Sequence, residues 1–232
     1  MRAVIVVYGV ACYLAFLAVF AALALFAWNA GGVRGIDAAP TGSLAIDLSL
    51  VAVFGVSHSV LARPAAKRVV TAIVTPAAER STYVLIASAS LALLIWQWRA
   101  EPTILWHVAT PAARAVVWAV AAGGAALIVG ATFLTDHFDL FGLRQVWLGG
   151  RYTPVPFVER SLYKHVRHPM MVGVLVWVWA APDMTVGHAL FAAGMSAYVF
   201  IGVAFEERGL ARTLGAPYED YRRRVPAFLP RR

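Results

Sequence analysis

The sequence predicts an all-α membrane protein, a polytopic helical bundle of five to six transmembrane helices with a C-terminal helical hairpin and a cytoplasmic tail. Of its 232 residues, 61% are hydrophobic and only 14% are charged, which is not the composition of a soluble domain. The apolar residues form long runs, and the basic residues gather in alternate connections between them. The first run is too long and too apolar to be the core of a cleaved signal peptide.

Six apolar runs give the expected helices. They cover about residues 4–28, 44–62, 81–98, 114–134, 170–181 and 186–205. The fifth run is short, so its helix crosses a bilayer only if it begins before Pro169 or forms a tight hairpin with the sixth, through a turn at 182–185. The tail 215–226 is typical of a short amphipathic helix with aromatic anchors. Four tryptophans form the expected aromatic belt at the outer interface: Trp96, Trp98, Trp106 and Trp118.

The basic residues predict the orientation of the bundle. If the connection 29–43 lies outside, the outside connections hold Arg34, Arg99 and Arg114, and the other 17 of the 20 Lys and Arg residues lie on the opposite side. Because basic residues concentrate on the cytoplasmic side, we expect both termini in the cytoplasm, in a bacterial-type inner (cell) membrane. The net charge of +8 then reflects topology and attraction to anionic membrane lipid, and we expect no nucleic-acid partner.

The most unusual stretch is 162–171, Leu-Tyr-Lys-His-Val-Arg-His-Pro-Met-Met, where basic side chains and a proline directly precede an apolar run. Basic residues at a membrane boundary commonly anchor a helix end. Pro169, however, lacks a backbone N–H and biases His168 away from helical geometry. Irregular backbone at membrane depth persists only when it is buried in protein or lines a cavity. We therefore expect a bound ligand here.

The segment 135–147 is the second unusual stretch. Its charged residues do not suit a lipid-facing helix, and a solvated loop does not need its large aromatic residues. Either it is a lid or re-entrant helix whose polar side faces an enclosed site, or it is an amphipathic interfacial helix. The residues concerned are Asp136, His137, Phe138, Asp139, Phe141, Arg144, Gln145 and Trp147.

Three more ionisable residues lie inside or at the ends of expected spans. His58 is about one turn inside the second helix, where an imidazole is either hydrogen-bonded packing or a functional group that faces a cavity. Glu206 and Glu207 lie at the expected end of the last helix, where the macrodipole disfavours acids. Compensation is expected from Arg167, His168 or a cationic ligand; a surface pair of Glu207 with its neighbour Arg208 is the alternative.

Three motifs together resemble the isoprenylcysteine carboxyl methyltransferase-like membrane enzymes, which use S-adenosylmethionine. They are Tyr163-x-x-Val166-Arg167-His168-Pro169, Glu206-Glu207-Arg208-x-Leu210 and Gly215-x-x-Tyr218-x-x-Tyr221. This resemblance covers about residues 162–230, and Met171 stands where the family often has an aromatic residue. The stretches 57–64, 137–145 and 167–171 also resemble the bacterial methanethiol S-methyltransferases, over nearly the whole chain. An NnrU-like accessory family is related.

The resemblance implies a pocket for S-adenosylmethionine, entered from the cytoplasm. Arg167 and His168 are suited to bind the carboxylate of this cofactor, and Glu206 or Glu207 its ammonium or ribose hydroxyls. The sequence has no Gly-rich dinucleotide fingerprint, and its histidines and single cysteine show no convincing metal spacing. The residues assigned to the cofactor are Tyr163, Lys164, Arg167, His168, Pro169, Glu206 and Glu207.

The resemblance also implies that methanethiol, a small thiol, is methylated to dimethyl sulfide. A thiol reacts as its thiolate, so a base or a nearby cation is needed. His58, His137 and Asp139 are the candidate bases, and Arg144 is a candidate for lowering the pKa of the thiol. The expected walls of the substrate pocket are Phe138, Phe141, Gln145 and Trp147.

We expect one membrane domain: a four-helix region (1–134), a cytoplasmic lid and cofactor-motif segment (135–169), and a hairpin and tail that complete the cofactor pocket (170–232). Two alternative functions remain. An isoprenylcysteine carboxyl or lipid methyltransferase would share the C-terminal motifs but need a groove open to the bilayer. A non-catalytic NnrU-like haem-binding or transport accessory protein would use intramembrane histidines as ligands.

Overall fold

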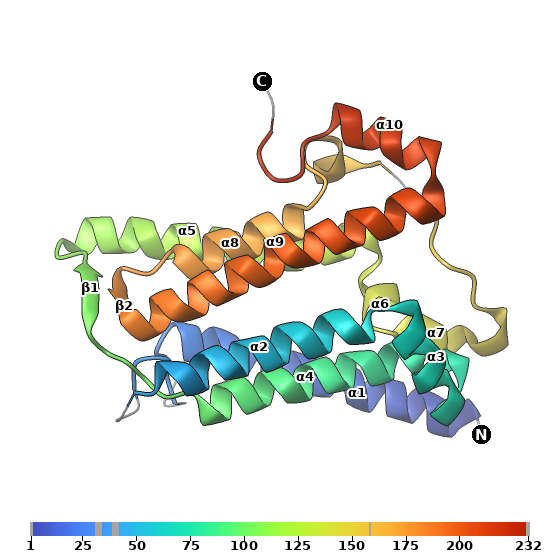
Figure 1. Cartoon of the computed structure of the whole chain (residues 1–232), viewed down its shortest axis with the longest axis horizontal. Helices are drawn as coiled ribbons and strands as arrows, with labels where there is room; N and C mark the ends of the chain where they lie inside the picture. The colour runs from blue at the N-terminus through green and yellow to red at the C-terminus, as the bar shows by residue number, and fades with distance from the viewer. Residues whose placement is uncertain (1, 31–33, 39–41, 158, 231–232) are drawn as a thin grey trace. The chain divides into compact units, whose positions relative to one another are not determined.

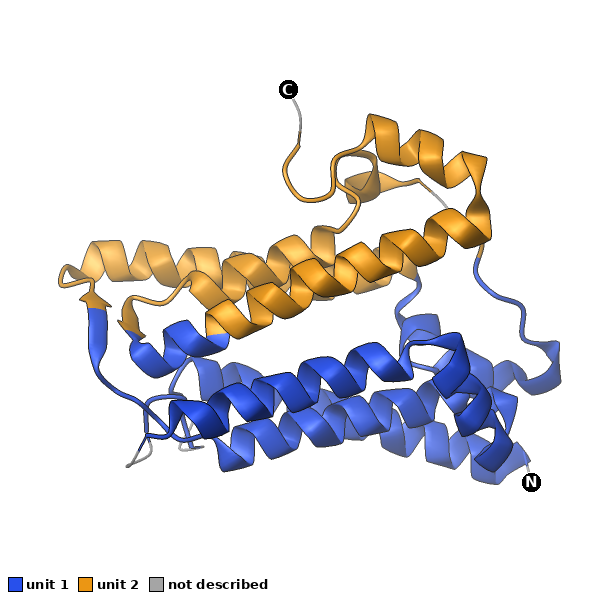
Figure 2. Cartoon of the chain, viewed as in Figure 1, with its two compact units in different colours: residues 1–105, 136–155, 185–191 blue, residues 106–135, 156–184, 192–232 orange. Residues whose placement is uncertain are grey.

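The computed structural model of the protein describes residues 2–30, 34–38, 42–157 and 159–230. All of the long elements are α-helices (Figure 1). The chain divides into two compact units, which Figure 2 shows in different colours. Unit 1 holds residues 1–105, 136–155 and 185–191, and unit 2 holds residues 106–135, 156–184 and 192–232. The expected first connection, 29–43, falls partly outside the described residues.

Five helices of the described chain are long and apolar enough to cross a membrane. They are α1 (Arg2–Ala27), α2 (Leu44–Leu61), α4 (Glu79–Gln97) with the 3-10 turn η1 (Pro76–Ala78) before it, α5 (Pro111–Thr135) and α9 (Val186–Leu214). Each coincides with one of the apolar runs, so the prediction of an all-α polytopic membrane protein is confirmed.

The remaining apolar run is helix α8 (Pro169–Trp179), which begins at Pro169 and has 11 residues. At the α-helical rise it reaches about 16 Å, roughly half the thickness of the hydrocarbon core of a bilayer. The helix α8 alone is therefore too short to cross a membrane.

Shorter elements connect the long helices. None of the 10 residues of α3 (Pro64–Ile73) is buried. The two strands β1 (Ile104–His107) and β2 (Asp183–Thr185) pair in a two-stranded sheet, so the predicted turn at 182–185 is partly strand. The other short elements are α6 (His137–Leu140), α7 (Leu143–Leu148), η2 (Gly149–Arg151), η3 (Ser161–Lys164) and α10 (Ala216–Arg224).

In unit 1, α1 packs on α4, and α4 packs on α2. Helix α7 lies close to α1: a Cβ atom added at Gly9 would be 2.6 Å from Cγ2 of Val146. This close approach favours a glycine, because a Cβ atom here would force the Val146 side chain to shift. The short helices that carry the residues of the 135–147 segment are thus anchored on the first span.

Trp98 lies in the core of unit 1. Its ring makes edge-to-face contacts with Phe26 and Phe191, at centroid distances of 5.9 and 5.8 Å, and its side chain is almost fully buried. The prediction that Trp98 joins an outer aromatic belt is therefore wrong, because the helix α4 ends one residue before it and the indole turns into the aromatic core. Trp96, by contrast, is exposed.

In unit 2, α5 and α8 pack closely through two glycines. A Cβ atom added at Gly173 of α8 would lie 2.8 Å from the carbonyl oxygen of Gly124 in α5, and small residues permit such contacts between membrane helices. The carboxylate of Asp183, the first residue of β2, accepts hydrogen bonds from both terminal nitrogens of Arg114, at 2.9 and 2.6 Å. This guanidinium, together with His107, lowers the pKa of Asp183 to about 2.

The C-terminal tail folds onto the end of α9 within unit 2. Tyr218, Tyr221 and Val225 are buried, and they pack against the partly buried side chains of Leu210, Ala211 and Leu214. The predicted short helix with aromatic anchors is confirmed as α10. The hydroxyl of Tyr221 donates to the carbonyl oxygen of Tyr163 at 2.7 Å, which connects the tail to the 162–171 motif.

Candidate functional site

The backbone of the 162–171 motif is irregular, as predicted from Pro169. His168 has φ −126° and ψ 61°, outside the helical region, and Pro169 is the first residue of α8. The N–H groups of Arg167 and His168 donate to the carbonyl oxygens of Pro226 and Ala227, at 2.9 and 3.1 Å. The motif therefore gains from the tail the backbone partners that a helix would otherwise supply.

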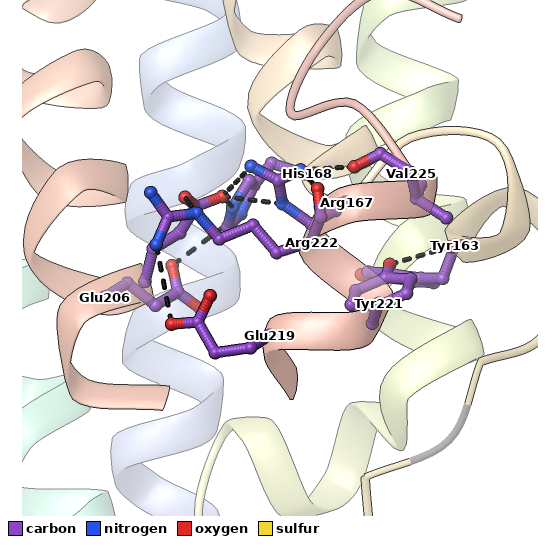
Figure 3. Close-up of polar contacts among 9 residues, drawn as sticks. Tyr163, Arg167, His168, Glu206, Glu219, Tyr221, Arg222 and Val225 are labelled. Atoms are coloured by element: carbon purple, nitrogen blue, oxygen red, sulfur yellow. Dashed lines mark hydrogen bonds and ion pairs between the residues drawn. The ribbon is translucent and has the colours of Figure 1, made fainter. Parts of the chain in front are cut away.

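Arg167 is the centre of a buried ion pair. Its Nε donates to Oε1 of Glu207 at 2.7 Å, and its second terminal nitrogen lies 2.5 Å from the same oxygen. The other terminal nitrogen donates to the carbonyl oxygens of Arg222, at 3.1 Å, and Val225. The side chains of Arg167 and Glu207 are 8% and 13% exposed. One guanidinium thus connects the start of α8, the helix α9 and the end of α10 (Figure 3).

His168 completes this cluster. Its Nε2 lies 3.0 Å from Oε1 of Glu207, and its Nδ1 lies 3.9 Å from Oε2 of Glu206. The prediction that Arg167 and His168 compensate the charge of Glu207 is confirmed. The expectation that Glu206 and Glu207 lie at the C-terminus of the last helix is wrong. Helix α9 continues to Leu214, so the two acids lie about two turns before its end, beyond the reach of the macrodipole effect.

Three charged side chains beside the buried pair are half-exposed. Glu206 is 52% exposed, Arg222 is 49% exposed and Glu219 is 44% exposed. Arg222 lies 3.7 Å from Glu207 and 3.6 Å from Glu219, both longer than a hydrogen bond. Sequence reasoning missed Arg222, because it stands in a run of three arginines and nothing in that run tells which one faces Glu207.

The other two motif residues assigned to the cofactor differ in their surroundings. Tyr163 is partly buried, and burial raises the pKa of its phenol. Lys164 is exposed. Of the residues assigned to the cofactor, the structure brings Arg167, His168 and both glutamates into one cluster. The backbone carbonyl of Tyr163 accepts from the buried Tyr221 of α10.

In unit 1, the residues of 136–145 form a second cluster. Asp136 has φ +85°, a left-handed conformation that is uncommon outside glycine and is enriched in Asp. Its Oδ1 accepts from the backbone N–H of Asp139 at 3.1 Å, and its Oδ2 accepts from Arg144 at 2.9 Å. Asp136 therefore caps the short helix α6 and fixes the direction in which the next residue, His137, leaves the backbone.

His137 is buried and hydrogen-bonded to the first helix. Its Nε2 lies 2.7 Å from the hydroxyl of Tyr13 in α1, and its ring is 4.8 Å from that of Phe141. Phe141 in turn stacks on Phe16 at 4.0 Å. Burial is the main cause that lowers the pKa of His137, so its imidazole is neutral at pH 7. Tyr13 was missed from the sequence, because α1 reads as uniformly apolar.

Asp139 and Gln145 form a neighbouring polar group in unit 1. The amide nitrogen of Gln145 donates to the backbone carbonyl and to Oδ1 of Asp139, at 3.1 and 3.3 Å. It also lies 3.4 Å from the hydroxyl of Tyr152. Burial and the nearby Asp139 raise the pKa of Tyr152.

Three residues predicted for the catalytic site or the substrate pocket do not lie inside this cluster: His58 pairs with another residue, and Phe138 and Trp147 are exposed. His58 belongs to a different pair, with its Nε2 2.6 Å from the hydroxyl of Tyr83. Phe138 and Trp147 are 53% and 66% exposed, whereas Phe141 and Gln145 lie inside the cluster. A role of Phe138 and Trp147 as pocket walls therefore stays a prediction. Among the described residues, no group of three or more His, Cys, Asp and Glu side chains is placed to hold a metal ion.

Comparison with known proteins places the chain in a family. The profile of the NnrU protein family matches residues 48–226. The methanethiol S-methyltransferase of Mycobacterium tuberculosis is 46% identical over 236 residues, which cover 99% of this chain and 97% of that protein. The chain belongs to the NnrU family and, within it, to the methanethiol S-methyltransferases.

Other members of the methanethiol S-methyltransferases are similar over most of their length. Methanethiol S-methyltransferase 1 of Bradyrhizobium diazoefficiens is 43% identical, over 96% of this chain and 81% of that protein. The Crocosphaera subtropica methanethiol S-methyltransferase is 36% identical, over 99% and 92%. No solved structure matches the chain.

Proposed function

We propose that this protein transfers a methyl group from S-adenosylmethionine to methanethiol and so forms dimethyl sulfide. The near-full-length similarity to proteins named methanethiol S-methyltransferases supports the substrate. The observation that supports S-adenosylmethionine as the methyl donor is the buried pair of Arg167 and Glu207, which is bordered by the half-exposed Glu206 and Arg222.

The chemistry of this cluster fits the donor. S-adenosylmethionine carries a carboxylate, an ammonium, ribose hydroxyls and a positively charged sulfonium, and it supplies an electrophilic methyl group when bound. Carboxylates such as Glu206 accept hydrogen bonds from an ammonium or from hydroxyls, and guanidinium groups pair with a carboxylate. In this proposal, Arg167, His168 and Pro169 hold the shape of the donor site, and Tyr163 and Lys164 lie at its border.

In unit 1 we assign the activation of the thiol to His137. A small alkyl thiol is poorly ionised near neutral pH, and its thiolate is the nucleophile. The buried neutral imidazole of His137 accepts the thiol proton, and the hydrogen bond to Tyr13 fixes the orientation of the ring. Asp139, held by Gln145, and Arg144, held by Asp136, remain the other candidates of this cluster, and His58 is a candidate in its own pair.

The thiolate sulfur forms a bond to the methyl carbon as that carbon separates from the sulfonium, which leaves dimethyl sulfide and S-adenosylhomocysteine. The proton stays on His137 until solvent takes it. Because two opposite charges neutralise one another in the transition state, an apolar, water-poor surrounding favours the reaction. Within unit 1, the stacked rings of Phe141 and Phe16 give His137 an apolar neighbourhood.

The topology and the domain organisation also belong to this proposal. The five apolar helices make the chain a multi-pass membrane protein. The excess of basic residues on one side supports cytoplasmic termini and a location in the bacterial cell membrane, where the donor enters from the cytoplasm. Termini on the same side require an even number of crossings. In this proposal α8 and the irregular segment before it therefore return the chain to the outer side, where β2 pairs with β1. The chain then works as one membrane domain from residue 1 to residue 232.

A comparison of acceptors tests the proposed function. The purified protein in detergent receives S-adenosylmethionine with methanethiol, with a prenylated cysteine or with a long-chain lipid acceptor. The S-adenosylhomocysteine formed with each acceptor is measured, and dimethyl sulfide is measured in the headspace by gas chromatography. We expect turnover with methanethiol alone. Turnover only with a prenyl or lipid acceptor would reassign the substrate. A haem Soret band in a protein that does not bind the donor would favour the accessory-protein alternative.

A further inference from the structure

We propose that Arg222, and not Arg167, contacts the α-carboxylate of the methyl donor, and that Arg167 is a positioning residue that holds Arg222 in place. This inference rests on the proposed function and changes the assignment that the sequence motif implies. It is carried by the hydrogen bonds of the two guanidinium groups, by their exposure and by the charge of the cluster.

The guanidinium of Arg167 is already fully used. Each of its three nitrogens has a partner: two contact Oε1 of Glu207, and the third donates to the carbonyl oxygens of Arg222 and Val225. Its side chain is 8% exposed. A ligand carboxylate could reach this group only by displacing Glu207, and breaking a buried ion pair leaves a buried charge without its partner, which is strongly unfavourable.

The guanidinium of Arg222 is held loosely by comparison. Its ion pairs with Glu207 and Glu219 have nitrogen–oxygen distances of 3.7 and 3.6 Å, and its side chain is half-exposed. Ion pairs of this kind contribute little to stability. A ligand carboxylate can therefore take Arg222 from Glu219 at little cost, and the planar guanidinium suits a two-point contact with a carboxylate.

Arg167 acts on Arg222 through the backbone. Its terminal nitrogen donates to the carbonyl oxygen of Arg222 at 3.1 Å, and also to that of Val225. Both carbonyl groups belong to the C-terminal end of α10, where they have no partner within the helix. By capping this end, the buried Arg167 fixes the place from which the Arg222 side chain extends.

The charge of the cluster also fits the donor. Glu207 and Glu219 pair with the two guanidinium groups, and Glu206 lies beside His168. With all three carboxylates ionised and His168 neutral the cluster has one negative charge. Burial raises the pKa of Glu206, and a cationic ligand favours its ionised form. S-adenosylmethionine has one net positive charge, because its ammonium and sulfonium outweigh its carboxylate. Glu206, which is half-exposed and lies 3.9 Å from His168, is the carboxylate available for the ammonium.

The test compares two ligands that differ in the amino-acid end. S-adenosylhomocysteine has the carboxylate and the ammonium, whereas 5′-methylthioadenosine lacks both. Binding of each to the full-length protein in detergent is measured by isothermal titration calorimetry. Arg222→Gln is expected to weaken binding of S-adenosylhomocysteine about tenfold, the low end for a charged hydrogen bond because the site is half-exposed, and to leave 5′-methylthioadenosine unchanged.

Arg223→Gln is the matched control. Arg223 follows Arg222 in the sequence, its side chain is 71% exposed, and it pairs with Asp220 at 3.3 Å. It should change neither affinity. Arg167→Lys keeps the positive charge but cannot span the contacts that the guanidinium makes, so it should lower the ratio of the two affinities as Arg222→Gln does. A purely structural role of Arg167 would weaken both ligands equally and leave that ratio unchanged.

The outcomes separate this inference from the proposed function. A wild-type protein that binds neither nucleoside would contradict the proposed donor itself. A wild-type protein that prefers S-adenosylhomocysteine, together with an Arg222→Gln variant that keeps the full preference, would overturn the assignment of Arg222 and leave the donor intact. Thermal unfolding of each variant shows that it is folded before binding is measured.

Discussion

The substitution Glu207→Gln is expected to destabilise the protein by about 3 kcal/mol. It keeps the size of the side chain and removes the charge that faces Arg167, whose side chain is 8% exposed. A buried charge that loses its partner costs about 3–5 kcal/mol. The low end applies here because the amide oxygen of glutamine can still accept a hydrogen bond from Arg167, and because Arg167 keeps its bonds to two backbone carbonyl groups.

Glu219→Gln is the matched control for this prediction. Glu219 is 44% exposed and lies 3.6 Å from Arg222, so its loss should cost less than about 1 kcal/mol. Thermal unfolding in detergent, followed by circular dichroism, measures both variants. In a chain of this size 1 kcal/mol shifts Tm by about 2–4 °C, so Glu207→Gln should lower Tm by roughly 6–12 °C. Equal shifts for the two variants would refute the view that Glu207 holds a buried ion pair.

The remaining predictions concern the thiol cluster and the packing of unit 2. His137→Ala should reduce turnover by about 10²–10⁴-fold while calorimetry still detects S-adenosylhomocysteine binding; unchanged turnover would remove His137 from the chemistry. Because burial lowers the pKa of His137, the acid limb of the profile of kcat/KM against pH, where the imidazole becomes protonated, should lie below the ordinary pKa of a histidine. An acid limb above that ordinary pKa would contradict the assignment. Gly124→Ala should lower Tm, because its Cβ would lie 2.9 Å from the backbone nitrogen of Trp177, whereas Gly123→Ala in the same helix meets nothing within 4 Å and should be neutral or slightly stabilising. Equal Tm values for the two alanine variants would disprove the close packing of α5 on α8.

The spans could be predicted from the sequence because a membrane helix must supply a long apolar run. The run 114–134 was found as α5, Pro111–Thr135, and the run 44–62 as α2, Leu44–Leu61. The same signal gave the wrong end for α9, which continues through Glu206 and Glu207 to Leu214. Hydropathy reports where the apolar surface ends, but a helix continues wherever its backbone hydrogen bonds do.

The partners within the candidate clusters could be predicted only in part. The pairing of Glu207 with Arg167 and His168 was predicted correctly, although the helix-dipole argument for it fails because α9 continues to Leu214. The pairing of His137 with Tyr13 was not predicted, because these residues are 124 positions apart and a tyrosine in an apolar helix gives no sign of the face that it occupies. Arg222 was missed for the same reason: its neighbours Arg223 and Arg224 have the same chemistry, and only the rotation of α10 distinguishes them.

The transfer of an isotopically labelled methyl group tests the central claim most directly. The purified protein is supplied with S-adenosylmethionine that carries a trideuterated methyl group and with unlabelled methanethiol, and headspace mass spectrometry measures the product. We predict dimethyl sulfide that is three mass units heavier, in an amount equal to the S-adenosylhomocysteine formed. Consumption of neither compound, or dimethyl sulfide without the label, would contradict a methyl transfer from this donor.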